Sequence, residues 1–299
     1  MTNAAERLRE KLARLEKDGH LGGDAAEPAA EPKAPEKGAQ PADDAKPDKP
    51  EKKKTPSKPA APTDWTEDTH RKATIALFAS VVVTALLYVI PYGHLIGYPL
   101  VLVSTVAHEL GHGIAAQIVG GTFVKLEVFS DGSGVATSMG VAGRFGRAFM
   151  AAGGLCGPAV VAAFGFVLGR RQRTSRITLI VTGVLLVGLE IWVVRSAFGL
   201  FFIAVLAALC LGTGLRAPPW VSQLVLLLLS VQLALSVFSR GDYLFTDVAR
   251  LASGPQPSDV SLMSDALFLP YWFWGIVCGA FSIVVLGIGL WIFVRGGKA

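Results

Sequence analysis

The apolar residues of this chain lie in long runs rather than in short alternating patterns. Between about Ala73 and Val294, stretches of eighteen or more largely uncharged residues recur, each long enough to cross a hydrocarbon layer of about 30 Å. We therefore predict an α-helical polytopic membrane protein whose transmembrane helices lie near residues 73–91, 97–119, 148–169, 177–194, 196–214, 221–239 and 271–294. Because Arg195 separates two short runs, the fourth and fifth could form one bent element. The expected number of spans is therefore six to seven.

A small β-hairpin is predicted directly after the second span. Val124, Leu126 and Val128 alternate with other residues, and the turn residues 131–134 follow them. Unpaired strands do not face lipid, because their backbone polar groups would have no partners there. The hairpin is therefore expected against other protein or at the membrane surface, close to the helix that precedes it.

The N-terminal segment differs in composition from the rest of the chain. Residues 1–18 contain leucines that share one helical face among alternating charges, which predicts a short amphipathic helix. This helix is either simply solvated or docks on an unidentified protein. Residues 19–70 are rich in Pro, Ala, Lys and Glu and predict a disordered linker. Residues 71–299 form the predicted membrane-embedded domain.

The net charge of +5 does not indicate a nucleic-acid-binding protein. Residues 1–72 hold fifteen basic and fifteen acidic residues, so the excess belongs to the loops between spans. Basic loops are expected on the cytoplasmic side of a membrane protein. The three cysteines lie within apolar runs and predict neither a disulfide framework nor a cysteine zinc cluster.

Basic residues also suggest an orientation. Lys52–Lys54, Arg71 and Lys72 favour a cytoplasmic N-terminal tail in an integral membrane protein. The basic loop 170–176 opposes this placement, since seven spans would put it on the other side from the tail. Either the number of spans or the orientation must then change.

The second span carries the pattern His-Glu-x-x-His. His108 and His112 are four residues apart and project from the same face of a helix, where both can bind one metal ion. Glu109 lies where it can act on a metal-bound water as a general base. Three ionisable groups within five residues of an apolar span are costly to bury and generally serve a function.

A catalytic zinc site needs a third protein ligand, which the motif does not supply. Four further crossings separate the end of the second span from residues 240–270, so that segment returns to the side where His112 emerges. The aspartates that qualify by this argument are Asp242, Asp247, Asp259 and Asp265.

The sequence resembles the site-2 proteases, in particular their compact branch of M50B-like peptidases. The resemblance rests on HELGHGIAAQIVGG, the following VFSDGSG, the glycine-rich AAGGLCGPA and SDALFLPYWFW before the last span. It implies that His108 and His112 bind Zn²⁺, that Glu109 is the catalytic base and that Asp265 is the third ligand. The aspartate motifs Asn-Pro-Asp-Gly and Leu-Asp-Gly of better-known branches are absent, so Asp247 is held as an alternative ligand.

The resemblance further implies a zinc metalloendopeptidase of a bacterial plasma membrane that performs regulated intramembrane proteolysis. Its substrate would be a membrane protein, such as a single-pass regulator or an anti-sigma factor. The substrate would add as an extended strand beside the hairpin, at the edge formed by Phe123, Val124, Lys125, Leu126, Glu127, Val128 and Phe129. A water channel would open toward the cytoplasm. The alternatives are a non-proteolytic metal-binding or transport protein and a membrane scaffold with an inactive motif.

Overall fold

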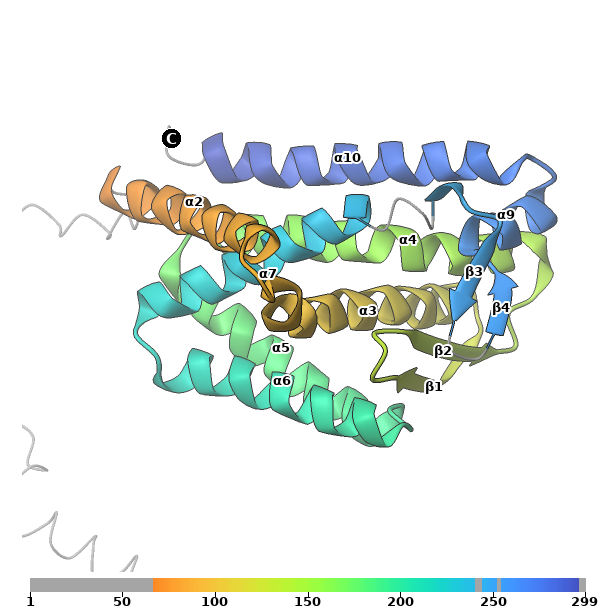
Figure 1. The fold of residues 1–299 in the computed structure, drawn as a ribbon, viewed down its shortest axis with the longest axis horizontal. Helices are drawn as coiled ribbons and strands as arrows, with labels where there is room; N and C mark the ends of the chain where they lie inside the picture. Colours follow the sequence, from red (N-terminus) through yellow and green to blue (C-terminus); the bar gives the residue numbers. More distant parts are fainter. Residues whose placement is uncertain (1–66, 240–243, 252–253, 296–299) are drawn as a thin grey trace, which may run out of the picture. The chain divides into compact units, whose positions relative to one another are not determined.

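The computed structural model describes residues 67–239, 244–251 and 254–295, and the predicted segment 1–18 and most of 19–70 lie outside them. The helices are α2 (Glu67–Val89), α3 (Gly93–Ile118), α4 (Gly143–Leu168), α5 (Gln172–Trp192), α6 (Ala197–Arg216), α7 (Pro219–Ser239), α9 (Asp259–Leu267) and α10 (Tyr271–Arg295). Two small antiparallel sheets consist of β1 (Thr122–Val128) with β2 (Gly134–Met139) and of β3 (Val248–Leu251) with β4 (Gly254–Pro257). The helical fold and the hairpin after α3 are as predicted (Figure 1).

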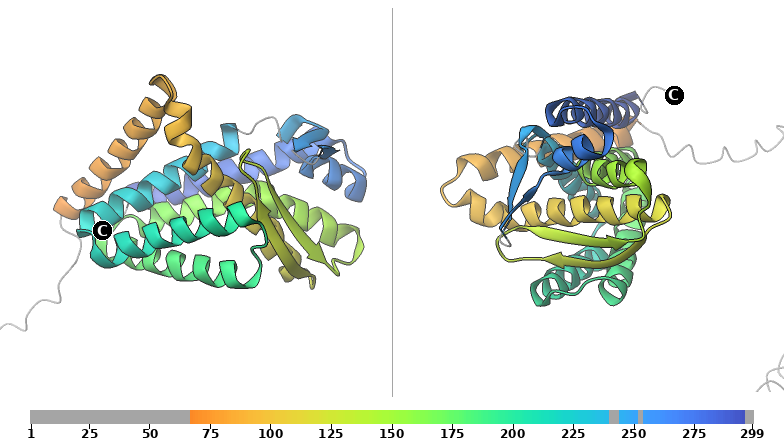
Figure 2. Two further views of the ribbon diagram at one scale, coloured as in Figure 1. Left: turned by 60° about the horizontal axis from the view of Figure 1, so that its bottom comes forward. Right: turned by 90° about the vertical axis from the view of Figure 1, so that its right-hand side faces the viewer.

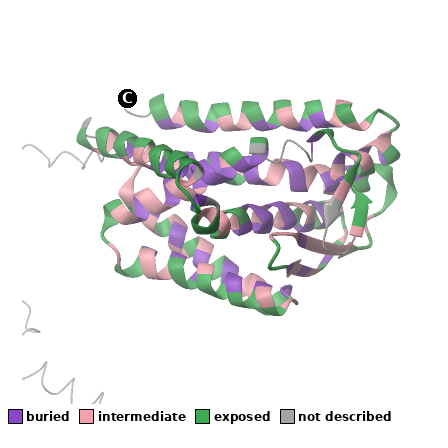
Figure 3. Ribbon diagram, in the orientation of Figure 1, coloured by how far each residue is buried: buried purple, intermediate pink, exposed green. Residues whose placement is uncertain are grey.

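Six of the described helices are long and apolar enough to cross a membrane, namely α2, α4, α5, α6, α7 and α10. They do not include α3, in which His108, Glu109 and His112 interrupt the apolar sequence. The fourth and fifth predicted spans are two separate helices, α5 and α6. Exposed positions predominate on α2 and α10, while buried ones concentrate on α3, α4 and α7 (Figure 3). The outward apolar faces are the surfaces that lipid would cover.

The start of α2 and the basic loop after α4 lie at the same end of the helix bundle. A buried cluster there contains Ala73, Phe166, Leu227 and Phe293, from α2, α4, α7 and α10. His70 Nε2 at the start of α2 also lies 3.0 Å from the carbonyl oxygen of Val294, at the end of α10. Helices α2 and α3 diverge from their connecting turn like the arms of a V and together carry the chain once to the opposite end (Figures 1 and 2).

This arrangement resolves the conflict between the basic segments. Arg71 and Lys72 share one end of the bundle with Arg170, Arg171 and Arg173, because α2 and α3 together make a single passage. Four further helices then return the chain to the end reached by α3, as the sequence argument required. The two hairpins and α9 lie at that second end, opposite to the basic one (Figure 1).

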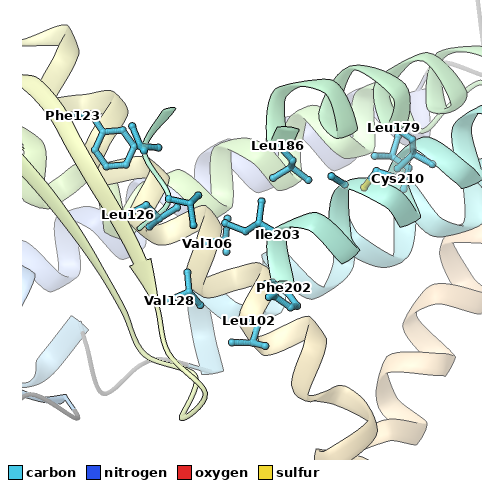
Figure 4. Packing of buried hydrophobic residues seen from close by; sticks show 14 residues of the cluster. Leu102, Val106, Phe123, Leu126, Val128, Leu179, Leu186, Phe202, Ile203 and Cys210 are labelled. Atoms are coloured by element: carbon cyan, nitrogen blue, oxygen red, sulfur yellow. The ribbon is translucent and has the colours of Figure 1, made fainter. Parts of the chain in front are cut away.

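The β1–β2 hairpin is held against the helices by its apolar side chains. Leu126 and Val128 are fully buried and pack with Val106 of α3 and Ile203 of α6 in one hydrophobic cluster (Figure 4). A Cβ at Gly113 would lie 2.5 Å from the ring of Phe123, so this glycine allows the hairpin to approach α3 closely. The hairpin is therefore a fixed part of the wall beside the His-Glu-x-x-His helix.

Candidate metal centre

Helix α3 presents the three motif residues to the protein interior. His108 and Glu109 are 9% and 8% exposed, and the side chain of His112 is also largely buried. Backbone contacts fix the position of the helix: a Cβ at Gly111 would lie 2.2 Å from the carbonyl oxygen of Gly153 in α4. Gly154 likewise leaves the space that the His112 ring fills. The glycines of AAGGLCGPA thus allow α4 to lie directly against the motif.

The third side chain at this point comes from the first residue of α9. The carboxylate of Asp259 lies 3.1 Å from His108 Nε2 through Oδ2 and 3.3 Å from His112 Nε2 through Oδ1. The two Nε2 atoms are 3.2 Å apart. Among the described residues, this trio is the group of three side chains that could hold a metal ion.

Asp259 occupies the place for which Asp265 was predicted. Asp265 lies six residues further along α9 and is exposed, and Asp247, the alternative, is exposed before β3. Asp242 lies outside the described residues. A sequence signal for Asp259 did exist: Ser258 is the N-cap of α9, and its hydroxyl accepts a hydrogen bond from the backbone N–H of Ser261. The N-cap fixes where α9 begins and therefore the backbone position of Asp259. The number of membrane crossings, by contrast, did not distinguish Asp259 from the other three aspartates.

The geometry of the trio suits a zinc ion. With bonds of about 2.0–2.1 Å, a tetrahedral zinc holds neighbouring ligand atoms roughly 3.3 Å apart, close to the three separations seen here. The Nδ1 of His112 lies 2.8 Å from the carbonyl oxygen of Met150, which can only accept a hydrogen bond. Nδ1 therefore carries the proton, and in the neutral ring Nε2 directs a lone pair toward the other two ligand atoms.

The charge of Asp259 is consistent with the binding of a cation. Burial by itself would raise the pKa of the Asp259 carboxyl, but the neighbouring His112 and His108 outweigh it and hold that pKa well below its usual range. The aspartate is therefore an anion facing two imidazole nitrogens. A cation between these three atoms would be stabilised by all of them.

Glu109 is hydrogen-bonded to the hairpin. Its Oε2 accepts a 2.8 Å hydrogen bond from the backbone N–H of Ala136 in β2. This approach requires a glycine in β2, since a Cβ at Gly134 would lie 2.8 Å from Cγ of Glu109. The sequence indicated neither contact, because it did not define which strand faces α3.

The outer edge of β1, which we predicted to receive a substrate strand, is already hydrogen-bonded. The Leu126 N–H donates to Val193 O, and Leu126 O accepts from the Arg195 N–H, at 2.8 and 3.0 Å. Val128 exchanges hydrogen bonds with the hydroxyl of Ser196. Residues 193–196 thus cover this edge of β1 at Leu126 and Val128, and the edge at Phe123–Phe129 is not the open one.

Comparison with known families adds an independent observation. The family model described as Peptidase M50B-like matches residues 79–289. The chain belongs to this peptidase family. The match confirms the resemblance to site-2 proteases, and together with the six candidate spans it identifies an integral membrane peptidase. No curated protein and no solved structure matches the chain.

The M50B-like match includes every residue of the site. His108, Glu109, His112 and Asp259 all lie within residues 79–289, and so do both hairpins. Asp265 also lies within the match, so family membership does not choose between the two aspartates. The distances in the structure place Asp259, and not Asp265, beside the two histidines.

Proposed function

We propose that this M50B-like peptidase is a zinc-dependent intramembrane endopeptidase that cleaves a peptide bond in or near a transmembrane segment of another membrane protein. The observation that carries the proposal is the trio of His108, His112 and Asp259, whose ligand atoms are spaced as a tetrahedral zinc requires. His108, His112 and Asp259 would hold the zinc and leave one position open.

Glu109 has the role of general acid and base in this proposal. Zinc, when bound, polarises a carbonyl group and lowers the pKa of water. Glu109 takes a proton from the attacking water and gives it to the departing amine, which requires its carboxylate to be free of the Ala136 N–H. Asp259 and His112 keep their positions through this step, because the start of α9 and the Met150 carbonyl hold them.

The substrate would bind as an extended strand at the open edge of β2 rather than at β1. Ala136 pairs with Leu126, whose backbone groups bond to residues 193–195, so this pair exchanges no hydrogen bonds and the Ala136 backbone groups face outward. They face the side of the hairpin where Glu109 lies. A single-pass regulator or an anti-sigma factor, unwound near the cleavage site, is the substrate class we propose.

The side of the membrane on which α2 starts also determines the side on which the site lies. If the basic end of the bundle is cytoplasmic, the hairpins and α9 lie toward the opposite side of the plasma membrane. A channel opening to the cytoplasm and a cytoplasmic start of α2 are therefore incompatible in this fold. We retain the cytoplasmic start of α2 and propose that water and substrate enter the site from the opposite side.

Zinc content per chain tests the metal site directly. Detergent-purified wild type and Glu109→Gln should each contain about one zinc, since Glu109 is not a ligand in the proposal. Asp259→Asn and His108→Ala should lose it, whereas Asp265→Asn, on the exposed face of the same helix, should retain it. Zinc absent from wild type purified with added metal would refute the proposal, and loss in Asp265→Asn alone would reinstate the sequence prediction.

Activity is the second arm of this test. Cleavage of a reconstituted single-pass substrate should occur with wild type and be lost in Glu109→Gln even though that variant keeps its zinc. A zinc-loaded wild type that cleaves none of a panel of membrane substrates, with phenotypes unchanged by Glu109→Gln, would instead support the non-proteolytic alternatives.

A further inference from the structure

The open edge of β2 offers backbone groups at alternate residues. Because Ala136 faces outward, its neighbours two positions away, Gly134 and Ser138, direct their backbone groups to the same edge. Val135, which lies between Gly134 and Ala136, directs its backbone groups to the other side and pairs with Glu127 of β1. A peptide strand that bonded to this edge from Gly134 to Ser138 would have to place a carbonyl oxygen opposite the N–H of Ala136.

The N–H of Ala136 already donates a hydrogen bond to Glu109. Its carboxylate is the acceptor at 2.8 Å and the residue as a whole is 8% exposed, so Glu109 blocks the middle of the open edge. The neighbouring turn is tied to the same helix, since the Thr105 hydroxyl donates to the carbonyl oxygen of Gly132 at 2.7 Å. Helix α3 therefore holds the hairpin close while its own glutamate covers the edge.

We propose that the Ala136 N–H is a latch that holds the Glu109 carboxylate on the hairpin until a peptide strand docks on β2 and takes that N–H for itself. This inference rests on the proposed function and adds a means of regulation to the same site. The exchange replaces one hydrogen bond by another, so docking releases Glu109 without leaving a buried donor unpaired. Ala136 is thus a positioning residue for the base.

The latch couples cleavage to the length of the substrate. A segment that pairs with both flanking residues, Gly134 and Ser138, displaces Glu109, while a peptide too short to form a strand leaves the base bound to Ala136. The same coupling would protect the enzyme's own hairpin and passing helices from hydrolysis. Substrates are consequently defined by their ability to become extended at β2 as well as by their sequence.

Two proline variants separate the latch from edge binding in general. Ala136→Pro removes the N–H that holds Glu109, and Ser138→Pro removes an outward N–H of the same edge that has no hydrogen bond to Glu109. Proline is tolerated where a strand's N–H faces outward. Both changes should raise KM for a long single-pass substrate. Only Ala136→Pro should increase kcat for a short fluorogenic peptide, by about tenfold, because one hydrogen bond to a charged acceptor no longer holds the base.

Amide exchange provides a readout that does not depend on activity. Hydrogen–deuterium exchange of the full-length, zinc-loaded protein, resolved to the Ala136 amide, should be about tenfold faster or more in Glu109→Ala than in wild type. Glu109→Gln retains an acceptor oxygen and should remain protected. Equal exchange in wild type and Glu109→Ala, or equal kcat changes in the two proline variants, would overturn the latch.

The two proposals can fail separately. Absence of zinc or of zinc-dependent cleavage in wild type would refute the proposed function, and the release step would fall with it. A wild type that binds zinc and cleaves the long substrate, but shows no Glu109-dependent protection of Ala136, would refute the latch alone.

Discussion

A Cβ at residue 154 would lie only 2.2 Å from the ring of His112, so Gly154 of α4 and His112 of α3 occupy a space that admits no further atom. The ring is also fixed by the Met150 carbonyl one turn earlier on α4. The orientation of the His112 ring on α3 is therefore determined by two residues of α4.

We expect Gly154→Ala to weaken zinc binding and to destabilise the protein by about 1–3 kcal/mol, the usual range for an overpacked core. The added methyl group must push the His112 ring out of line with His108 and Asp259. Zinc content and thermal unfolding in detergent measure the two effects. Gly188→Ala in α5 is the matched control, because a Cβ there has no heavy atom within 4 Å. Similar zinc loss in both variants would contradict the contact.

Removing the metal should lower the stability of the protein. In the proposed function zinc binds only the folded chain, so free zinc at one hundred times its dissociation constant should add about 2.7 kcal/mol to the free energy of unfolding. A chelator should reverse the increase in Tm. Asp259→Asn should show no zinc-dependent shift, while Asp265→Asn should shift like wild type. A zinc-dependent shift that persisted in Asp259→Asn would show that the stabilising ion binds elsewhere.

Ser196 joins two parts of the fold through one hydroxyl group. It caps the N-terminus of α6 by accepting from the Gly199 N–H, and it also bonds to the backbone of Val128 in β1. Ser196→Ala should therefore cost about 1–2 kcal/mol in the free energy of unfolding. Ser230→Ala should cost less, since the Ser230 hydroxyl donates to Leu226 within its own helix. Equal unfolding midpoints for the two variants would argue against the role of Ser196.

The orientation can be measured with single cysteines in a chain whose three natural cysteines are replaced by alanine. We expect Lys72→Cys and Arg173→Cys to react with a membrane-impermeant maleimide only after cells are opened, because both lie at the basic end. Asp265→Cys, on the exposed face of α9 at the other end, should react in intact cells. Labelling of Lys72→Cys and Arg173→Cys from opposite sides would contradict the single passage of α2 and α3.

Local patterns in the sequence defined most of the fold. Apolar runs located each long helix, and the alternation in 124–128 with the following turn located the β1–β2 hairpin. Six candidate spans in the described part of the chain agree with the expected six to seven. The predicted span at 97–119 is not among them, because the polar residues of α3 lower its hydropathy, and α3 shares one passage with α2. The β3–β4 hairpin was not predicted, since both strands are only four residues long and β4 contains two prolines.

The site was predictable only where its residues are neighbours in sequence. His108 and His112 are fixed by helical periodicity, and the structure places them together with Glu109 on α3. Asp259 comes from a segment about 150 residues away. The N-cap at Ser258 indicates where α9 begins, but the choice of Asp259 over Asp265 depends on how α9 packs. The occupied edge of β1 likewise depends on residues 193–196, which lie far from the hairpin in sequence.

Helix α4 supplies none of the three ligand atoms, yet it determines the distances between them. Its glycines bring α3 into backbone contact, and its small side chains, including Ala148 and Ala151, pack under Val260 of α9. Helix α4 thus positions both α3, which carries the two histidines, and α9, which carries Asp259. Changes in side-chain size along α4 should consequently tune metal affinity over a continuous range while every ligand stays chemically intact.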